Sequence, residues 1–205
     1  MENTFKLTLA AAFVAGGVAM AGNATPAHAA CDVDKAGYDL TGDEAQAVYE
    51  CLADDMHAGY KQGNKRWIPA EIVNDYRSWG AASKFPAAPG FHGERFLMTY
   101  VNDIGFDAYT DYKDEDVNIP AGTVIVKESF SVSDSGKVSV GPLFIMQKAE
   151  AGTDSRSDDW LYMMTSASGV PQGVNVYAAC VACHQDNFGF QGGLGYPVEE
   201  ARIEK

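Results

Sequence analysis

Residues 180 to 184 read Cys-Val-Ala-Cys-His, a C-x-x-C-H sequence of the kind that attaches a c-type haem. The two thiols add to the two vinyl groups of the porphyrin, and the adjacent His184 is then close enough to bind the iron as its proximal ligand. A zinc site would need four ligands, and no second Cys/His pair occurs at suitable spacing. A redox pair of Cys180 and Cys183 would not need His184. We therefore expect the chain to fold around one covalent haem c, with the zinc site and the redox pair as the alternatives.

The N-terminal segment has the features of a secretory signal peptide. Lys6 precedes an apolar stretch from Leu7 to Met20, and the small-residue sequence Ala27-His28-Ala29 supplies a cleavage site. The apolar stretch is shorter than the ~20 residues that span a membrane. We therefore expect residues 1–29 to be removed and residues 30–205 to form one exported domain, located in the periplasm of a bacterium.

Acidic side chains outnumber basic ones, and the formal net charge is −13. This excess disfavours nucleic acid and anionic membrane surfaces as partners. It suits a redox partner with a basic surface, although acidic surfaces also serve solubility alone. The mature chain of about 175 residues is long enough for one domain whose core encloses a haem.

The other two cysteines, Cys31 and Cys51, have no histidine at ligand spacing. Because an exported chain meets an oxidising compartment, we expect them to form a disulfide rather than remain free thiols. The bond would close a loop of about twenty residues and stabilise the fold by roughly 3 kcal/mol in the chain-entropy model. It would also tie the N-terminal segment to the first helix.

Helical patterns come first along the mature chain. The Thr41-Gly42-Asp43-Glu44 capping box predicts a helix from about residue 41 to 59, and Pro69 predicts the start of a second helix that runs to Trp79. A loop over 84–93 and a short helix capped by Asn102-Asp103 follow in this half of the chain. The predicted strands are 94–101, 123–132, 137–148 and 160–165.

The last predicted elements are a loop over 169–173 and a short helix that carries the haem motif. Helices, then an antiparallel sheet, then a C-terminal haem-attachment helix make the expected fold class α+β. In this respect the chain differs from the small all-helical cytochromes c, in which the haem motif usually lies near the start.

Side chains of the strand over 123–132 divide between two faces, because successive residues point to opposite sides. The more apolar face has Val124, Val126, Glu128, Phe130 and Val132, and the more polar face has Thr123, Ile125, Lys127, Ser129 and Ser131. The pattern alone points Lys127 to solvent and Glu128 inward. A haem pocket on the second face would instead place Lys127 inside the protein, with Ile125 and Thr123 lining the pocket.

Five segments resemble the cytochrome P-460 family and the related cytochrome c′-beta group in their order and spacing. They are Asp75 to Trp79, Thr99 to Asn102, Pro120 to Glu128, Asp158 to Trp160, and Cys180 to His184. The resemblance implies a mono-haem periplasmic protein, mostly antiparallel β and often homodimeric. It also implies an iron that one histidine binds and that is open or weakly occupied on its other side.

The resemblance implies one of two activities. Some members oxidise hydroxylamine and have a lysine cross-linked to the porphyrin edge, and others bind nitric oxide or carbon monoxide without that bond. The family's lysine falls on Lys127, and its neighbour Glu128 is a second catalytic candidate. A distal arginine and glutamate of the oxidising members fall near Leu97 and Phe144, so an obvious general base is missing here. Such an apolar pocket favours small neutral ligands, unless a slip in the alignment brings Glu94 or Arg95 into this role.

Electron transfer is the alternative function, and it requires a strong sixth ligand such as methionine. Methionines in strands are more often core residues than ligands. His57 lies late in the first helix, and His92 would reach the haem only if its glycine-rich loop folds inward. The sequence thus predicts a haem c protein for small nitrogen ligands, with their oxidation left open. The methionines in predicted strands are Met98, Met146, Met163 and Met164.

Overall fold

The centre of the fold is a seven-stranded sheet in the order β1-β2-β3-β5-β6-β7, with β4 paired to β3. Every pair of neighbouring strands is antiparallel. The computed structural model describes residues 30–63 and 67–205, so the expected signal peptide lies outside the described residues. The strands are β1 (Gly80–Ala81), β2 (Phe96–Val101), β3 (Val124–Val132), β4 (Val138–Val140), β5 (Leu143–Lys148), β6 (Trp160–Thr165) and β7 (Pro171–Val174).

Helices precede, interrupt and follow this sheet. A π-helical turn, Tyr177–Val181, leads directly into the last helix, and a 3-10 turn, Tyr76–Ser78, extends the second. N-terminal helices, an antiparallel sheet and a C-terminal helix confirm the predicted α+β class. The α-helices are α1 (Gly42–Lys61), α2 (Ala70–Asp75), α3 (Phe91–Glu94), α4 (Phe106–Thr110) and α5 (Ala182–Phe188). Among the described residues, no helix combines the length and apolar character needed to cross a membrane.

The predicted start of α1 and the predicted disulfide are both confirmed. Glu44 Oε2 accepts a hydrogen bond from the Thr41 backbone N–H at 2.8 Å, and Thr41 Oγ1 accepts one from the Glu44 N–H at 3.3 Å. This reciprocal pair satisfies two backbone donors that a helix start otherwise leaves without partners. Cys51 of α1 is disulfide-bonded to Cys31, which attaches the N-terminal segment to the helix.

Two predicted elements are shorter in the structure. The strand expected over 137–148 is divided into β4 and β5, because Gly141 and Pro142 interrupt it and proline cannot donate to a strand ladder. Asn102 does not cap the following helix, and α4 begins at Phe106 instead. The Asn102 side chain accepts from Val124 N–H and donates to Gly122 O, so it joins β2 to the start of β3.

A third difference is an additional strand. Residues 171–174, predicted as loop, form the edge strand β7 beside β6. Proline cannot donate a backbone hydrogen bond, but the first position of an edge strand does not require one, so Pro171 is compatible with this position. The expected loop over 84–93 also contains the start of α3.

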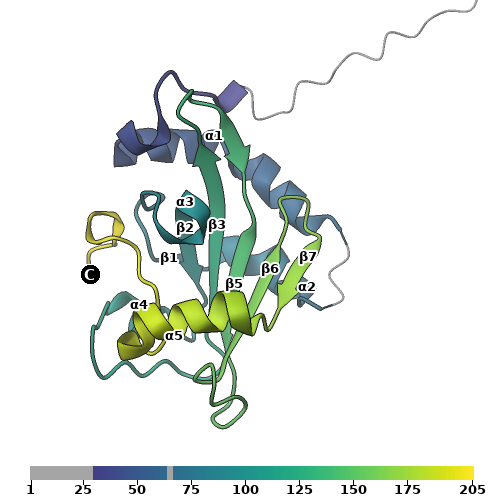
Figure 1. The fold of residues 1–205 in the computed structure, drawn as a ribbon, viewed down its shortest axis with the longest axis vertical. Coiled ribbons are helices and arrows are strands. Elements are labelled where there is room, and N and C mark those ends of the chain that lie inside the picture. Colours follow the sequence, from purple (N-terminus) through teal and green to yellow (C-terminus); the bar gives the residue numbers. More distant parts are fainter. Residues whose placement is uncertain (1–29, 64–66) are drawn as a thin grey trace, which may run out of the picture.

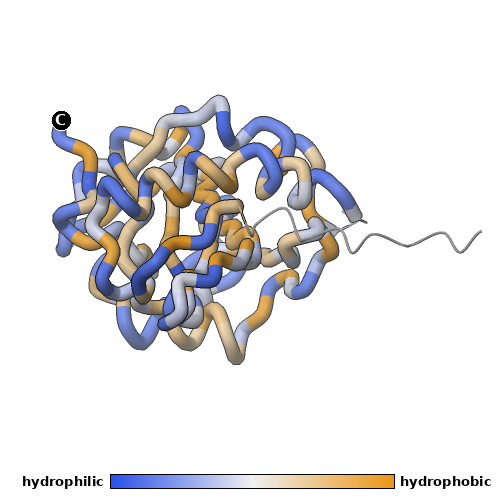
Figure 2. Tube along the Cα trace, turned by 90° about the horizontal axis from the view of Figure 1, so that it is seen from above, coloured by the Kyte–Doolittle hydropathy of each residue, from blue (hydrophilic) through white to orange (hydrophobic). Residues whose placement is uncertain are grey.

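Helices cover both faces of the sheet (Figure 1). α1 and α2 pack on one face, against Val126 and Ile145, and we call this the first core. α4 and the turn that leads into α5 pack on the other face, against Ile125 and Met146, and form the second core. Figure 2 shows hydrophobic segments through the middle of the molecule and hydrophilic segments around its outside. The sheet thus separates two hydrophobic cores.

Among the described residues, one carboxylate is buried beside the first core, that of Glu128 on β3, which is 1% exposed. Arg77 Nη2 and Nε donate to Glu128 Oε1 at 2.6 and 2.9 Å, and the Tyr76 hydroxyl donates to the same oxygen. The Tyr49 hydroxyl of α1 donates to Oε2 at 2.5 Å. Burial raises the pKa of Tyr49 and Tyr76, which keeps both hydroxyls protonated as donors. One buried carboxylate therefore joins α1 and the turn after α2 to the central strand.

Replacing Glu128 by Gln is expected to lower the free energy of unfolding by about 2 to 3 kcal/mol. Breaking one side of a buried ion pair costs about 3 to 5 kcal/mol, and Arg77 keeps some contact with water, which reduces the loss. Urea denaturation followed by far-ultraviolet circular dichroism measures the change. The double variant Glu128→Gln/Arg77→Met removes both charges and should recover part of the loss. A change below about 0.5 kcal/mol in the single variant, the size of a surface substitution, would contradict this role.

Candidate haem site

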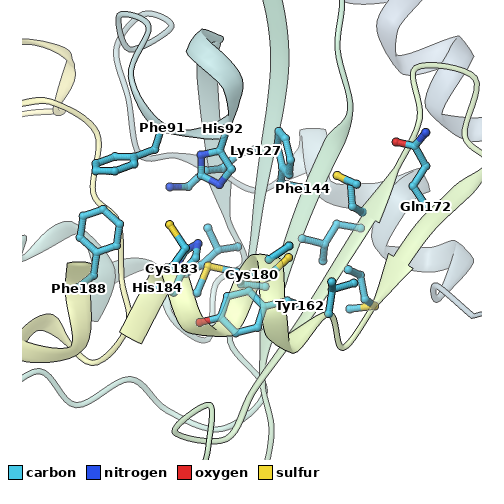
Figure 3. A pocket seen from close by; sticks show the side chains of 17 residues that line it. Phe91, His92, Lys127, Phe144, Tyr162, Gln172, Cys180, Cys183, His184 and Phe188 are labelled. Carbon is cyan, nitrogen blue, oxygen red and sulfur yellow. The ribbon is translucent and has the colours of Figure 1, made fainter. Parts of the chain in front are cut away.

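A cavity of about 290 Å³ lies between the sheet and the C-terminal helix, on the face opposite the buried Glu128. Cys180, Cys183 and His184 line it from the π-helical turn and α5. The strands supply an apolar floor, because every second residue of β3, β5 and β6 points to this side. Figure 3 shows these side chains converging from the helix below and from the strands behind. The floor consists of Ile125, Phe144, Met146, Tyr162 and Met164.

His184 presents one ring nitrogen to this cavity in a form that can bind a metal. Its Nδ1 lies 2.7 Å from the carbonyl oxygen of Gly193, and because a carbonyl only accepts, Nδ1 carries the proton and Nε2 keeps its lone pair. Burial lowers the pKa of His184 to about 4, so the ring is neutral at physiological pH. Tyr162 packs against the ring, with centroids 4.8 Å apart, and limits its rotation.

The side chains at the cavity fit a covalent haem c. Cys180 and Cys183 are not disulfide-bonded, and both are partly exposed along the cavity. Two thiols, an imidazole with an available nitrogen and an apolar floor are the donor set and surroundings that this group requires. Cys180, Cys183 and His184 would hold the haem.

Lys127 lies inside the cavity wall although its strand pattern pointed it to solvent. It is 6% exposed, and its Nζ donates to the Gly195 carbonyl at 2.6 Å. Among the ion pairs of the described residues, none includes Lys127. Burial without a counter-charge lowers its pKa to about 8, so Lys127 is mainly an ammonium group at neutral pH but loses its proton more readily than an exposed lysine. The structure therefore supports the alternative of a pocket on the second face, lined by Lys127 and Ile125. Thr123, which was also expected there, is buried but does not line the cavity.

Residues 192–195, which we call the glycine strap, accept hydrogen bonds through their backbone carbonyls from two cavity side chains and from Trp160 beside them. Gly192 O accepts from Trp160 Nε1 at 2.9 Å, Gly193 O from His184, and Gly195 O from Lys127. Gly192 and Gly193 have φ of 66° and 76°, a region in which residues with a side chain are strained. The sequence analysis missed the strap. Its only signal was the glycine-rich sequence Gly-Gly-Leu-Gly after the haem motif.

His92 folds inward over the cavity from α3. Its ring centroid lies 4.5 Å from that of Phe144 and 6.0 Å from that of His184. Its Nδ1 is buried without a hydrogen-bond partner in the described part of the chain. Burial lowers the pKa of His92 to about 3, so this ring is also neutral. Phe91, beside it, packs on Phe188 of α5 and was not expected at the site.

Two of the predicted site residues do not line the cavity. Glu128 alternates with Lys127 on β3 and points into the first core, where Arg77 and two tyrosines bind it. Leu97 of β2 is on the same face of the sheet as Lys127, but its partner on β3 is Ser129, two residues beyond Lys127. On its other side Leu97 pairs with Ala87. Phe144, opposite Lys127 on β5, does line the cavity as predicted.

The remaining candidates divide between the two faces. Met146 and Met164 line the cavity, and Met98 belongs to the first core. Met163 belongs to the first core and also lines the cavity. His57 hydrogen-bonds the Val73 carbonyl on the helical side and is remote from the cavity. Glu94 and Arg95 are not among the residues that line it.

The comparison with known families matches the chain to the model of the cytochrome P460 family over residues 73–189. The matched span begins in α2, includes the central strands and ends after α5, so it contains Lys127 and the whole C-x-x-C-H sequence. None of the curated proteins compared with the chain matches it. The family match covers more than half of the sequence and agrees with the resemblance of the five segments. The chain therefore belongs to the cytochrome P460 family, whose members bind one covalent haem c with iron.

Proposed function

We propose that this chain is a periplasmic haem c protein that binds a small nitrogen ligand, nitric oxide or hydroxylamine, on the iron face opposite His184. The observation that carries this proposal is the apolar floor of the cavity. Four of its five residues offer no charge and no hydrogen-bond donor, and the fifth, Tyr162, adds one uncharged hydroxyl. Among the described residues that line the cavity, none is an aspartate or a glutamate. Such surroundings favour a small neutral ligand over a charged one.

Each residue at the site has a distinct task in this proposal. When bound, the haem supplies an iron that coordinates the ligand and exchanges electrons. His184 keeps a fixed orientation because Gly193 and Tyr162 restrain its ring. Phe144 excludes water from the opposite face. Lys127 is the only ammonium group among the side chains that line the cavity in the described structure, and it can donate a hydrogen bond there.

Lys127 also favours a second candidate function, oxidation of hydroxylamine. The burial of Lys127 at the cavity wall supports the proposal of a cross-link like the one that some family members have at the porphyrin edge. The new C–N bond would replace one N–H bond of Lys127 and one C–H bond of the porphyrin, releasing two protons and two electrons to an oxidant of the peroxide class. The electrons of hydroxylamine itself would pass to a redox partner, and the net charge of −13 favours one with a basic surface.

Removal of the two thiols tests the haem attachment. Because Lys127 alone could retain the haem, the test compares Cys180→Ala/Cys183→Ala with Cys31→Ala/Cys51→Ala, both in a Lys127→Met background. Intact mass of the denatured protein should show the polypeptide alone for the first variant and polypeptide plus haem for the second. The disulfide variant controls for loss of two cysteines elsewhere. Haem mass retained in the first variant would contradict the assignment.

Ligand binding is measured on the dithionite-reduced holoprotein by absorption spectroscopy. Titration with nitric oxide should change the spectrum with an endpoint of one ligand per haem, and carbon monoxide should do the same. Phe144→Gln should weaken carbon monoxide binding about ten-fold, or 1.4 kcal/mol, because a polar side chain retains water that the ligand must displace. Phe190→Gln, at an exposed phenylalanine, is the matched control. No spectral change with either gas would favour the His/Met electron carrier, with Met146 or Met164 as sixth ligand.

The Lys127 bond is tested by mass after chemical cleavage of both thioethers. A cross-linked protein should retain the haem on a peptide that contains Lys127, and Lys127→Met should release it. The holoprotein is examined before and after treatment with hydrogen peroxide, the oxidant that bond formation requires. If the haem separates from the wild-type peptide in both samples, the cross-link and the second candidate function are wrong, and reversible ligand binding is what remains.

A further inference from the structure

We propose that His92 is a displaceable second axial ligand, which binds the iron opposite His184 until a small ligand takes its place. This inference rests on the proposed function, because it specifies what occupies the ligand face in the resting protein. It adds to the site a residue from α3 that belongs to none of the segments on which the family resemblance depends.

The spacing of the two histidine rings carries the proposal. Their centroids lie 6.0 Å apart. A metal–nitrogen bond is about 2.0 Å, and a ring nitrogen lies about 1 Å from its ring centre, so two imidazoles on one metal have centres about 6 Å apart. The angle of 61° between the ring planes is compatible with this, since both planes can contain the bond axis at any mutual rotation. The observed distance of 6.0 Å between the ring centroids is therefore that of two imidazoles that share one metal.

The surroundings of His92 give a second, independent observation. Its Nδ1 is buried without a hydrogen-bond partner in the described part of the chain, a costly arrangement for a polar atom in an apolar site. Nearly all buried polar groups in proteins have a partner, so an orphaned one indicates a missing group. Phe144 packs on the ring at 4.5 Å and holds it on the His184 side of α3 (Figure 3). A metal bond would anchor this ring from the side that lacks a partner.

The backbone around His92 explains why the bond would be reversible. His92 and Gly93 have φ of 66° and 74°, and Glu94 follows with 55°, so three consecutive residues are left-handed. This region is strained for residues with a side chain, here His92 and Glu94. Departure of His92 from the iron would release this strain. Gly90 and Gly93 have no neighbouring atom within 4 Å of an added Cβ, so the segment has room to move.

The methionines at the cavity are less suited to this role. Met146 and Met164 extend from the paired strands β5 and β6, whose backbone cannot retreat without breaking ladder hydrogen bonds. His92 instead belongs to a segment of four residues, Phe91–Glu94. A ligand that must leave and return is therefore better supplied by His92.

Occupation by His92 has a measurable consequence for ligand binding. An incoming ligand finds an open iron only in the fraction of molecules from which His92 has departed, and its apparent affinity falls by that fraction. If His92 is bound in nine-tenths of the molecules, the affinity is about ten-fold weaker than that of a protein without it. The binding rate should also level off at high ligand concentration, where departure of His92 becomes the slow step.

Histidine-to-glutamine substitutions in the holoprotein test the proposal. His92→Gln is compared with His57→Gln, the same change at a histidine that hydrogen-bonds Val73 on the other side of the sheet. Electron paramagnetic resonance and absorption of the ferric protein should show a low-spin iron in the wild type and in His57→Gln. His92→Gln should be high-spin, and added imidazole should restore the low-spin signal. This rescue would exclude a purely structural effect of the substitution.

Carbon monoxide binding to the reduced proteins supplies the second readout. The wild-type rate should reach a plateau as the gas concentration rises, whereas the His92→Gln rate should stay proportional to concentration, with an affinity about ten-fold higher. A wild-type iron that is already high-spin would overturn the proposal. A low-spin signal that persists in His92→Gln would also overturn it and would indicate Met146 or Met164. Failure of the proposed function would give a different result from failure of the His92 proposal. If the protein does not bind small ligands at the iron, His92→Gln will bind neither carbon monoxide nor nitric oxide.

Discussion

The hydrogen bonds to the buried carboxylate of Glu128 are the interaction on which the arrangement of this protein depends. Tyr49, Tyr76 and Arg77 come from two separate helical segments, and all donate to one side chain of the central strand β3. A buried carboxylate is stable only with such partners, so the helical layer and the strand can combine in one way. The register of β3 relative to the helices follows from this requirement.

The same requirement determines the cavity on the far side of the sheet. Because side chains alternate along a strand, fixing Glu128 toward the helices fixes Lys127 and Ile125 toward the haem site. Phe144 and Met164 follow on the neighbouring strands through the antiparallel register. The glycine strap then closes the site from its other end, with carbonyls bound to Trp160, His184 and Lys127. The position of the lysine is therefore a consequence of the packing of the opposite core.

Much of the fold and part of the site could be predicted from the sequence, because local chemistry determines them. The capping box of α1, the cysteine pair and the haem motif each depend on residue types at short spacing, and no distant contact is needed to recognise them. The burial of Lys127 could not be decided in this way. Alternation along β3 indicates that Lys127 and Glu128 face opposite sides, but only the second packed face makes both sides interior.

The position of His92 shows a different limit. In the sequence Gly90-Phe91-His92-Gly93 the histidine is expected to lie in a surface loop, since glycine permits many conformations and no periodic pattern surrounds it. What turns it inward is a run of left-handed residues together with contacts to Phe144 and to the α5 side of the molecule, all of which are distant in sequence. If the site consisted of apolar strand residues alone, no side chain would compete with an incoming ligand for the iron, and none would protect the iron while no ligand is bound. A strained segment that carries one imidazole supplies both, because the iron can hold the ring while the site is idle and release it at small cost when a ligand arrives.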